Sequence, residues 1–403
     1  MRSCAWLLDS LASNSLFPWP LSVRLVHVFP LSALSWLHGA LVSRLQSACN
    51  HQRHRWHGLR LIAADKTTLA LPESQSLYKR FGAHKGQQGL GPIAVELCCL
   101  FDLVSRAPLR LVFDKVCTSE HKLILKLIRA LKKGDLLLID SGFYYCATFI
   151  KILCRHAHFL IPAKSNNRPK VLRTLGHGDY LCQIKDSHDH TTLIVRVLFV
   201  YRNGFRRRRL VTSLLDPSLF PASELANLYH MRWDIETFYR DFKHTMKAIC
   251  WHCRTPTSFH QELLVHMIVV CLIRIAMLEA SHLANVSVGQ LSFARALTET
   301  RLFLKLLLSN AEQNRWATIW TAFVTCCAKY RVKIKPNRQF PRDRQQYRRK
   351  SRGLERKRPG RKPKDSFVRH SFLPAAFMFC IYLFNRCFNS PARSMETVQT
   401  STI

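Results

Sequence analysis

The sequence predicts an α/β fold: a mixed sheet with flanking helices and a β-rich insertion. Three observations predict it. Short β-prone runs alternate with amphipathic helical runs between residues 55 and 164, which is the order of a mixed α/β sheet. Further along, Asn203-Gly204 stands between two β-prone runs and is a strong hairpin signal. Helix-forming sequence resumes near Ala222 and extends to residue 310.

The first part of the core is expected to run β-β-β-α-β-α-β. Apolar alternation or short apolar runs indicate the strands, and apolar spacing of three to four residues indicates the helices. Gly134 suits the end of the first helix. Strands are expected at 59–71, 93–103, 108–116, 135–140 and 158–163, helices at 120–133 and 145–156, and a glycine-rich loop at 81–89.

Two acids, Asp65 and Asp140, lie near the ends of two predicted strands. Strand ends of one open sheet meet at one edge, which is where such sheets place their sites. The complete division of the chain is then five segments. These are an N-terminal helical segment (1–54), the first core part (55–164), the insertion (165–220), the helical second core part (221–310) and a C-terminal region (311–403).

The charge of the chain predicts a polyanionic partner. There are 61 Lys+Arg against 25 Asp+Glu, a formal net charge of +36. Residues 331–365 alone hold 16 Lys/Arg and 3 Asp/Glu, with prolines that exclude a continuous helix. Such an excess favours nucleic acid, with an anionic membrane surface as the alternative.

Membrane insertion and a disulfide framework are not expected. The apolar stretches 25–43, 263–281 and 371–385 are interrupted by polar residues or shorter than the roughly 20 residues of a spanning helix, so we expect buried helices. The 15 cysteines are odd in number and partly adjacent, which indicates reduced thiols. Cys250 and Cys253 form a lone CxxC, for which packing is favoured over zinc.

The segment 229–243 carries the most informative pattern. No Pro or Gly occurs from Ser223 to Lys247, which predicts one long helix. On a regular helix its Tyr, Arg, Glu and Lys share one side. A surface ion-pair ladder could produce the same pattern, but two strand-end acids upstream favour a metal site beside phosphates. The four residues are Tyr229, Arg232, Glu236 and Lys243.

This spacing, Tyr-x2-Arg-x3-Glu-x6-Lys, resembles the signature of a family of bacterial insertion-sequence transposases, group four in the usual numbering. Asp140-Ser-Gly-Phe resembles the second-acid motif of that family, and Asp65-Lys-Thr resembles the first, which more often reads Asp-Gly/Ser-Thr. Ser119-Glu120-His121 is also similar. The resemblance covers about residues 55–310 and implies a ribonuclease-H-like core with a β-rich insertion.

The resemblance implies a DDE-type transposase that cleaves and joins double-stranded DNA, namely transposon ends and target. Asp65, Asp140 and Glu236 would be catalytic and would hold two Mg²⁺ ions, with Mn²⁺ as the alternative. Positioning contacts to DNA phosphates would come from the other signature residues and a basic run in the insertion: Tyr229, Arg232, Lys243, Arg206, Arg207, Arg208 and Arg209. A homodimer in synapsis and a cytoplasmic, nucleoid-associated location in a bacterium are expected on the same ground.

Two alternatives stay open at this stage. One is a nuclease on the same fold, which cuts but does not join. The other is an inactive or repurposed DNA-binding protein, because the segment before Asp65 is short for a complete end-recognition domain. Relatives that form DNA hairpins stack a base on Trp in the insertion; here only Tyr180, Tyr201 or Phe205 could replace it, and ordinary strand roles are favoured.

Overall fold

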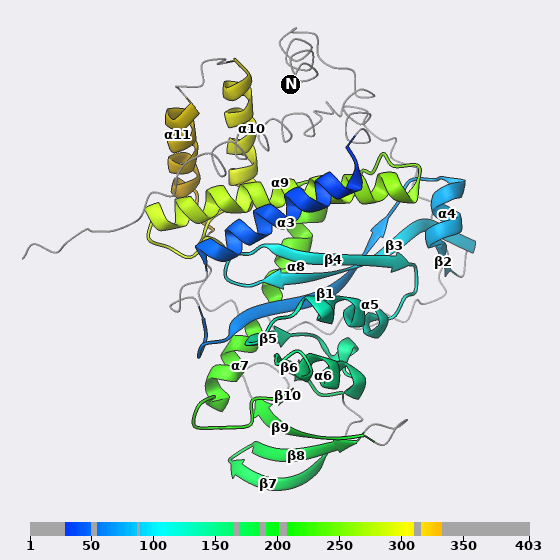
Figure 1. The fold of residues 1–403 in the computed structure, drawn as a ribbon, viewed down its shortest axis with the longest axis vertical. Helices are drawn as coiled ribbons and strands as arrows, with labels where there is room; N and C mark the ends of the chain where they lie inside the picture. The colour runs from blue at the N-terminus through cyan, green and yellow to red at the C-terminus, as the bar shows by residue number, and fades with distance from the viewer. Residues whose placement is uncertain are drawn as a thin grey trace, which may run out of the picture.

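The computed structural model describes residues 29–49, 55–86, 89–164, 169–185, 191–200, 208–309 and 316–332. The basic tail from residue 333, and most of the 331–365 prediction with it, lies outside the described residues. Figure 1 shows the arrangement: one twisted sheet runs through the molecule, with helices on both faces and a helical layer at one end.

The sheet joins the predicted core and the predicted insertion. Its order is β2-β3-β1-β5-β6-β10-β9-β8-β7, with β4 paired to β3. The strands are β1 (Arg60–Ala70), β2 (Ala83–Gly86), β3 (Gly89–Asp102), β4 (Pro108–Lys115), β5 (Asp135–Leu138), β6 (His158–Pro162), β7 (Lys170–Gly176), β8 (Asp179–Lys185), β9 (Thr192–Val200) and β10 (Arg208–Thr212). β5 pairs in parallel with β1 and β6, whereas β1 and β3 are antiparallel, so the sheet is mixed as predicted.

The β-rich segment is continuous with the core through β10. β9 and β10 pair antiparallel, as the hairpin signal predicts, and β10 also pairs antiparallel with β6. The turn itself, with Asn203 and Gly204, lies outside the described residues, as do Tyr201 and Phe205. Tyr180 packs edge-on against Phe199 with ring centroids 5.8 Å apart. That contact is an ordinary strand-pair contact.

The predicted loop at 81–89 is wrong. A helix, α4 (Gln75–Phe81), ends at Gly82, whose φ of +77° suits glycine. The chain then enters β2, which pairs antiparallel with the start of β3. A hairpin therefore replaces the loop. The predicted helices are present but shorter: α5 (Glu120–Leu127) passes into a 3₁₀ turn to Ala130, and α6 spans Cys146–Leu153.

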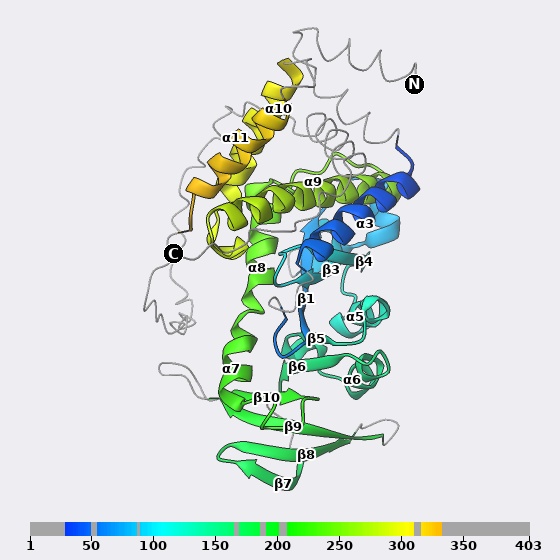
Figure 2. The ribbon, with the colours of Figure 1, turned by 60° about the vertical axis from the view of Figure 1, so that its left-hand side comes forward.

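Strand alternation divides the core between the two faces of the sheet. On β1, Leu61 and Ala63 pack with one cluster, whereas Ile62 and Ala64 pack with the other. The first cluster lies under α7 (Ala222–His230) and α8 (Trp233–Arg240), and the second lies under α5 and α6. Figure 2 shows these two helical layers on opposite sides of the sheet.

The end layer is formed by α3 (Leu31–Ala48), α9 (Pro256–Leu283), α10 (Phe293–Ser309) and α11 (Trp316–Lys329). α9 is long and apolar enough to span a membrane, but 83% of its most apolar window is buried within the fold. It is therefore a core helix, as predicted for 263–281. Cys253 is buried and Cys250 is exposed, both as free thiols, and the described residues hold no cluster of three or more His, Cys, Asp or Glu spaced for a metal.

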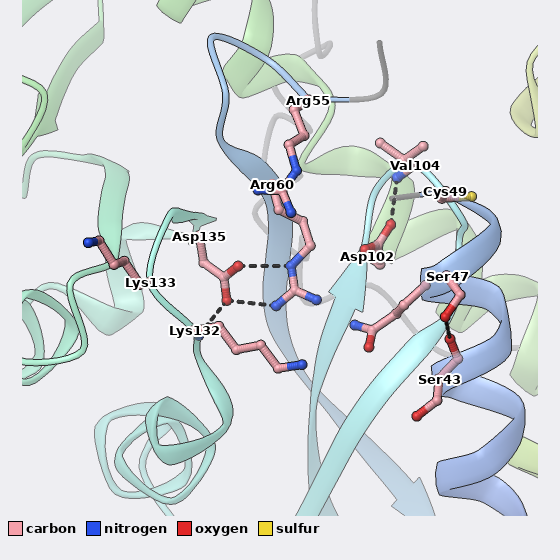
Figure 3. Close-up of a pocket in the computed structure, with 11 residues that line it drawn as sticks. Ser43, Ser47, Cys49, Arg55, Arg60, Asp102, Val104, Lys132, Lys133 and Asp135 are labelled. Atoms are coloured by element: carbon pink, nitrogen blue, oxygen red, sulfur yellow. Dashed lines mark hydrogen bonds and ion pairs between the residues drawn. The ribbon is translucent and has the colours of Figure 1, made fainter. Parts of the chain in front are cut away.

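A pocket of about 280 Å³ lies where β1 and β5 begin (Figure 3). Inside it, the Arg60 guanidinium donates two hydrogen bonds of 2.8 Å to the buried Asp135 carboxylate, which also accepts from the backbone N–H of Lys132. Asp102 accepts from the backbone N–H groups of Val104 and Ser105. The Arg60–Asp135 pair joins the start of β1 to the start of β5. We call this pair the strand clamp, because it fixes the register of β1 against β5.

Candidate active site

Asp65 and Asp140 lie close enough for their charges to interact. The prediction that both lie near strand ends is wrong for Asp65, which is in the middle of β1, whereas Asp140 follows the end of β5. The parallel register of β1 and β5 ends at the pair Ala63 and Leu138, and each acid lies two residues further along the chain. In-register residues of parallel strands point to the same face, here the face that α8 covers. Asp140 is exposed, and its Oδ1 accepts from the Ser141 N–H at 2.8 Å as the cap of a short 3₁₀ turn.

Glu236 reaches the same place from α8. Phe238 on α8 stacks on Phe101 of β3 with ring centroids 5.1 Å apart. Tyr239 donates a hydrogen bond of 2.6 Å to the backbone oxygen of Asp65. These contacts hold α8 over β1, with the Glu236 side chain 40% exposed.

Arg232 lies among the acids. Its Nη2 is 2.9 Å from Glu236 Oε1, and its Nη1 is 3.9 Å from Asp65 Oδ2. Burial raises the pKa of Asp65 to about 6, and the nearby charges of Glu236 and Asp140 add to this, against the Lys66 N–H and the Arg232 guanidinium. The carboxylates are thus close enough to disfavour one another, and Arg232 compensates part of that repulsion.

The prediction of one long helix over 223–247 is wrong. At Met231 and Arg232 the backbone switches to i→i+3 hydrogen bonds: Met231 N–H donates to Leu228 and Arg232 N–H to Tyr229. A π-helical stretch follows at Asp241–Thr245. The sequence has no Pro or Gly at either point that would interrupt a helix. Both irregularities bring side chains onto the sheet, so they arise from tertiary contacts and not from the local sequence. A π-helical bulge of this kind often occurs at a functional site.

Tyr229 and Lys243 contact the sheet at either side of the acids. Tyr229 is 5% exposed, and its hydroxyl donates to the backbone oxygen of Ile139 at 3.2 Å. Lys243 Nζ donates to the backbone oxygen of Thr68 at 2.8 Å, and burial lowers its pKa. All four signature residues therefore lie along β1 and β5, although the helix that carries them is not regular.

The basic run of the insertion is only partly described. Arg206 and Arg207 lie outside the described residues. Arg208 is exposed on β10. Burial raises the pKa of Tyr229, and the positive charge of Arg208 opposes that rise. Arg209 Nη2 donates to the backbone oxygen of Lys164 at 3.0 Å.

A second charged group, for which the sequence predicted no role, lies on the opposite face of β1. Burial raises the pKa of Glu120, and the charge of Asp140 adds to this, whereas Lys66 opposes it. Lys66 Nζ is 3.6 Å from Glu96. A Cβ on Gly142 would lie 1.5 Å from Glu120 Oε2, so the glycine of Asp-x-Gly makes room for this carboxylate. The signal in the sequence was Ser119-Glu120, a helix cap followed by an acid.

The donor set suits a hard divalent cation. Carboxylate oxygens are the ligands such ions take, and Mg²⁺ needs only one or two per ion because waters and phosphates supply the rest. A cation would also favour the ionised form of Asp65, whose pKa is raised mainly by burial and further by the charges of Glu236 and Asp140.

Two known proteins are similar to this chain in sequence. The chain is 28% identical over 303 residues to the transposase InsG of insertion sequence element IS4 from Escherichia coli K12, covering 71% of this chain and 68% of that protein. It is 25% identical over 170 residues to a probable transposase of insertion sequence element IS5377 from Geobacillus stearothermophilus, covering 40% and 44%.

A solved structure is also similar at low identity. It is the cryo-EM structure of the piggyBac transposase synaptic complex with hairpin DNA, at 10% identity and a TM-score of 0.36 over 66% of this chain and 57% of that one. The transposase DDE domain family matches residues 56–272, a span of more than half the chain that contains all three acids. The chain therefore belongs to the transposase DDE domain family and is a DNA transposase.

Proposed function

We propose that Asp65, Asp140 and Glu236 are the catalytic acids and that Mg²⁺ is the ion they hold. Transposases with a DDE domain use divalent metal ions. The assignment is supported by the parallel pairing of β1 and β5, which ends two residues before Asp65 and Asp140, and by Arg232, which contacts both Glu236 and Asp65. Such ions make a bound water nucleophilic and offset charge on the leaving oxygen.

The reaction is two successive displacements at phosphorus. Water attacks a phosphodiester at the element end, and the broken P–O bond leaves a 3′-hydroxyl. That hydroxyl then attacks a phosphodiester of the target, and a target oxygen leaves. Asp65, Asp140 and Glu236 would hold the metal ions, which would activate the attacking oxygen and offset charge on the leaving oxygen.

Arg232 has two roles in this proposal. In the protein alone it pairs with Glu236 and Asp65. Once those carboxylates hold ions, the guanidinium loses its partners and its planar fork can bind a phosphate. Tyr229 and Lys243 flank it along the sheet and would contact neighbouring phosphates of the element end. Arg208 and Arg209 would extend the track along β10, with Arg206 and Arg207 before them.

The direct test is an assay with a duplex of the element's terminal DNA and a supercoiled plasmid target. Asp65→Ala, Asp140→Ala and Glu236→Ala should each abolish Mg²⁺-dependent cleavage while end binding persists. Asp114→Ala, which removes an acid on β4 paired to surface lysine and arginine, is the matched control and should cleave normally. Full activity in any of the three variants would contradict the assignment, and nicking without joined product would favour the nuclease alternative.

The remaining expectations are also proposals. Synapsis of two ends requires two active sites, so we propose a homodimer on DNA, which sedimentation of the protein with end duplex would test. A bacterial, cytoplasmic and nucleoid-associated location fits the charge of +36. The segment boundaries proposed from the sequence place the insertion at 165–220, and limited proteolysis would test them.

A further inference from the structure

The α5–α6 layer carries a concentrated basic surface. Between residues 120 and 157, seven Lys or Arg side chains are exposed, whereas Asp140 is the one exposed acid of that span. We call this set the α5–α6 basic surface: Lys122, Lys126, Arg129, Lys132, Lys133, Lys151 and Arg155.

Few carboxylates neutralise this surface. Lys126 forms an ion pair with Asp114, with the two atoms 2.6 Å apart. Among the described residues, the ion pairs leave the other six cations without a carboxylate partner. Arg155 donates to the backbone oxygen of Leu131. A face of uncompensated like charge in a folded protein indicates a polyanionic partner.

The surface begins at the catalytic end of the sheet and runs away from it. Glu120, at the start of α5, lies against Gly142 just beyond Asp140. Lys133, at the other end, directly precedes Gly134 and the start of β5. The basic surface therefore extends along the length from Asp135 to Asp140, roughly 17 Å at 3.3 Å per strand residue. That length corresponds to about five base-pair steps of duplex DNA.

The cations on α5 and α6 lie on the opposite side of the sheet from the signature residues, whereas Lys132 and Lys133 line the pocket where β1 and β5 begin. α8 carries Arg232 and Glu236 over one face, and α5 and α6 cover the other (Figure 2). A duplex on α5–α6 is therefore a different molecule, or a different arm, from one held by α8. The two paths converge at Asp140, which is exposed at the strand end between them.

We propose that the α5–α6 basic surface binds the target duplex, so that target and element end reach the acids from opposite faces of the sheet. This inference rests on the proposed strand transfer and names the place of its second DNA substrate. Strand transfer brings two duplexes to one centre, and this surface offers a second phosphate-binding track that ends there.

The test separates end cleavage from strand transfer. The triple variant Lys122→Gln, Arg129→Gln, Lys133→Gln should keep end cleavage within about twofold. Strand transfer at a limiting plasmid concentration should fall about tenfold. The salt slope for binding a random 30-base-pair duplex should drop by about 2.7, at about 0.9 per lost phosphate contact.

The matched control removes three exposed cations elsewhere. Arg295, Arg301 and Lys329 lie on α10 and α11, and their triple Gln variant has the same net charge as the test variant. The control should lose much less transfer. Photocrosslinking adds a direct readout: Lys133→p-benzoylphenylalanine should label the plasmid strand, and the same substitution at Arg301 should not.

Three results would overturn the proposal. An unchanged salt slope would exclude phosphate contact at this surface. An equal fall in end cleavage and in transfer would assign the surface to the element end. If the unmodified protein cleaves ends but never joins them, strand transfer and the target assignment both fail, while the slope still decides whether the surface binds DNA.

Discussion

Replacing Asp65 with Asn should stabilise the metal-free protein at neutral pH. Folding raises the pKa of this carboxyl from 3.8 to about 6, mainly through burial. An acid with a raised folded pKa opposes folding when it is ionised, fully above about pH 6. That cost disappears as the pH falls through 6 towards 3.8, because the folded state then binds a proton that the unfolded state does not.

The magnitude follows from the shift. About two pKa units at 1.36 kcal/mol each set a ceiling of roughly 3 kcal/mol. The attraction of Arg232 is already part of this shift, and the Asp65 side chain is 21% exposed, so we expect a gain of about 1–2 kcal/mol at pH 7.5. Roughly a third of that gain should remain at pH 4.5, where the carboxyl of the unfolded chain is still mostly ionised. For a domain of 150–250 residues the gain at pH 7.5 corresponds to a rise in Tm of roughly 2–8 °C.

The assay is thermal unfolding in EDTA between pH 4.5 and 8, with Asp114→Asn as the control of opposite sign. Hydrogen bonds and ion pairs with Lys126, the Lys115 N–H and Arg80 lower the pKa of Asp114 to about 2, although its slight burial acts in the other direction. The ionised Asp114 therefore stabilises the folded protein above about pH 4, and this contribution is lost below that pH. Asp114→Asn should thus destabilise the protein at neutral pH. The loss should be only about 1 kcal/mol, because Lys126 and Arg80 are half exposed.

When Mg²⁺ is added in the same experiment, the order of the melting temperatures of the Asp65→Asn variant and the unmodified protein should be reversed. Mg²⁺ should raise the Tm of the unmodified protein at pH 7.5 and leave the Asp65→Asn variant almost unchanged, since binding to the folded state adds stability only where the ligand is present. If Asp65→Asn melts lower than the unmodified protein at every pH without metal, a free-energy cost of burying the ionised Asp65 carboxylate is refuted.

Three further outcomes are expected. Arg232→Gln should lower end cleavage by 100-fold or more while Arg232→Lys restores little, because a point charge replaces a planar fork; full rescue by Lys in the cleavage assay would count against bidentate phosphate binding. Gly142→Ala should destabilise the protein and impair cleavage, and adding Glu120→Ala should recover stability, since the clash is with that carboxylate; additive effects in urea unfolding would exclude the contact. Arg60→Ala should cost about 3–5 kcal/mol because it leaves its carboxylate partner buried and unpaired, and a loss below 1 kcal/mol would show that the strand clamp does not hold the strands.

Sequence reasoning could single out the three proposed acids because each belongs to a local pattern. Asp65 and Asp140 follow apolar strand patterns, and Glu236 belongs to a motif with fixed spacing on a helix. The pairing of β10 with β6 could not be predicted, because it joins residues about 50 positions apart and no local pattern specifies the partner. Residues 201–207, which connect β9 to β10 in the sequence, lie outside the residues that the structure describes.

The irregular helix shows a different limit. Propensity favoured an unbroken helix from Ser223 to Lys247, since no Pro or Gly interrupts it. The observed breaks arise where Tyr229, Arg232 and Lys243 contact the sheet, and tertiary contacts of this kind override weak local preferences. A regular helix would have placed these charged residues in a row on the protein surface. The two irregularities instead bring Arg232 and Glu236 onto β1, so a surface ion-pair ladder does not describe this segment.

Alternation along β1 then explains the charge on both faces of the sheet. Asp65 points to the α8 face with Glu236, and Lys66 points to the α5 face with Glu96 and Glu120. Where relatives more often have Gly or Ser, this chain has a lysine that offsets the two glutamates on the far face. Without that cation, Glu120 would add its full charge beside Asp140. We therefore expect Lys66→Ser to require Glu120→Gln for normal Mg²⁺ affinity, because the lysine and the glutamate balance each other's charge behind the three proposed catalytic acids.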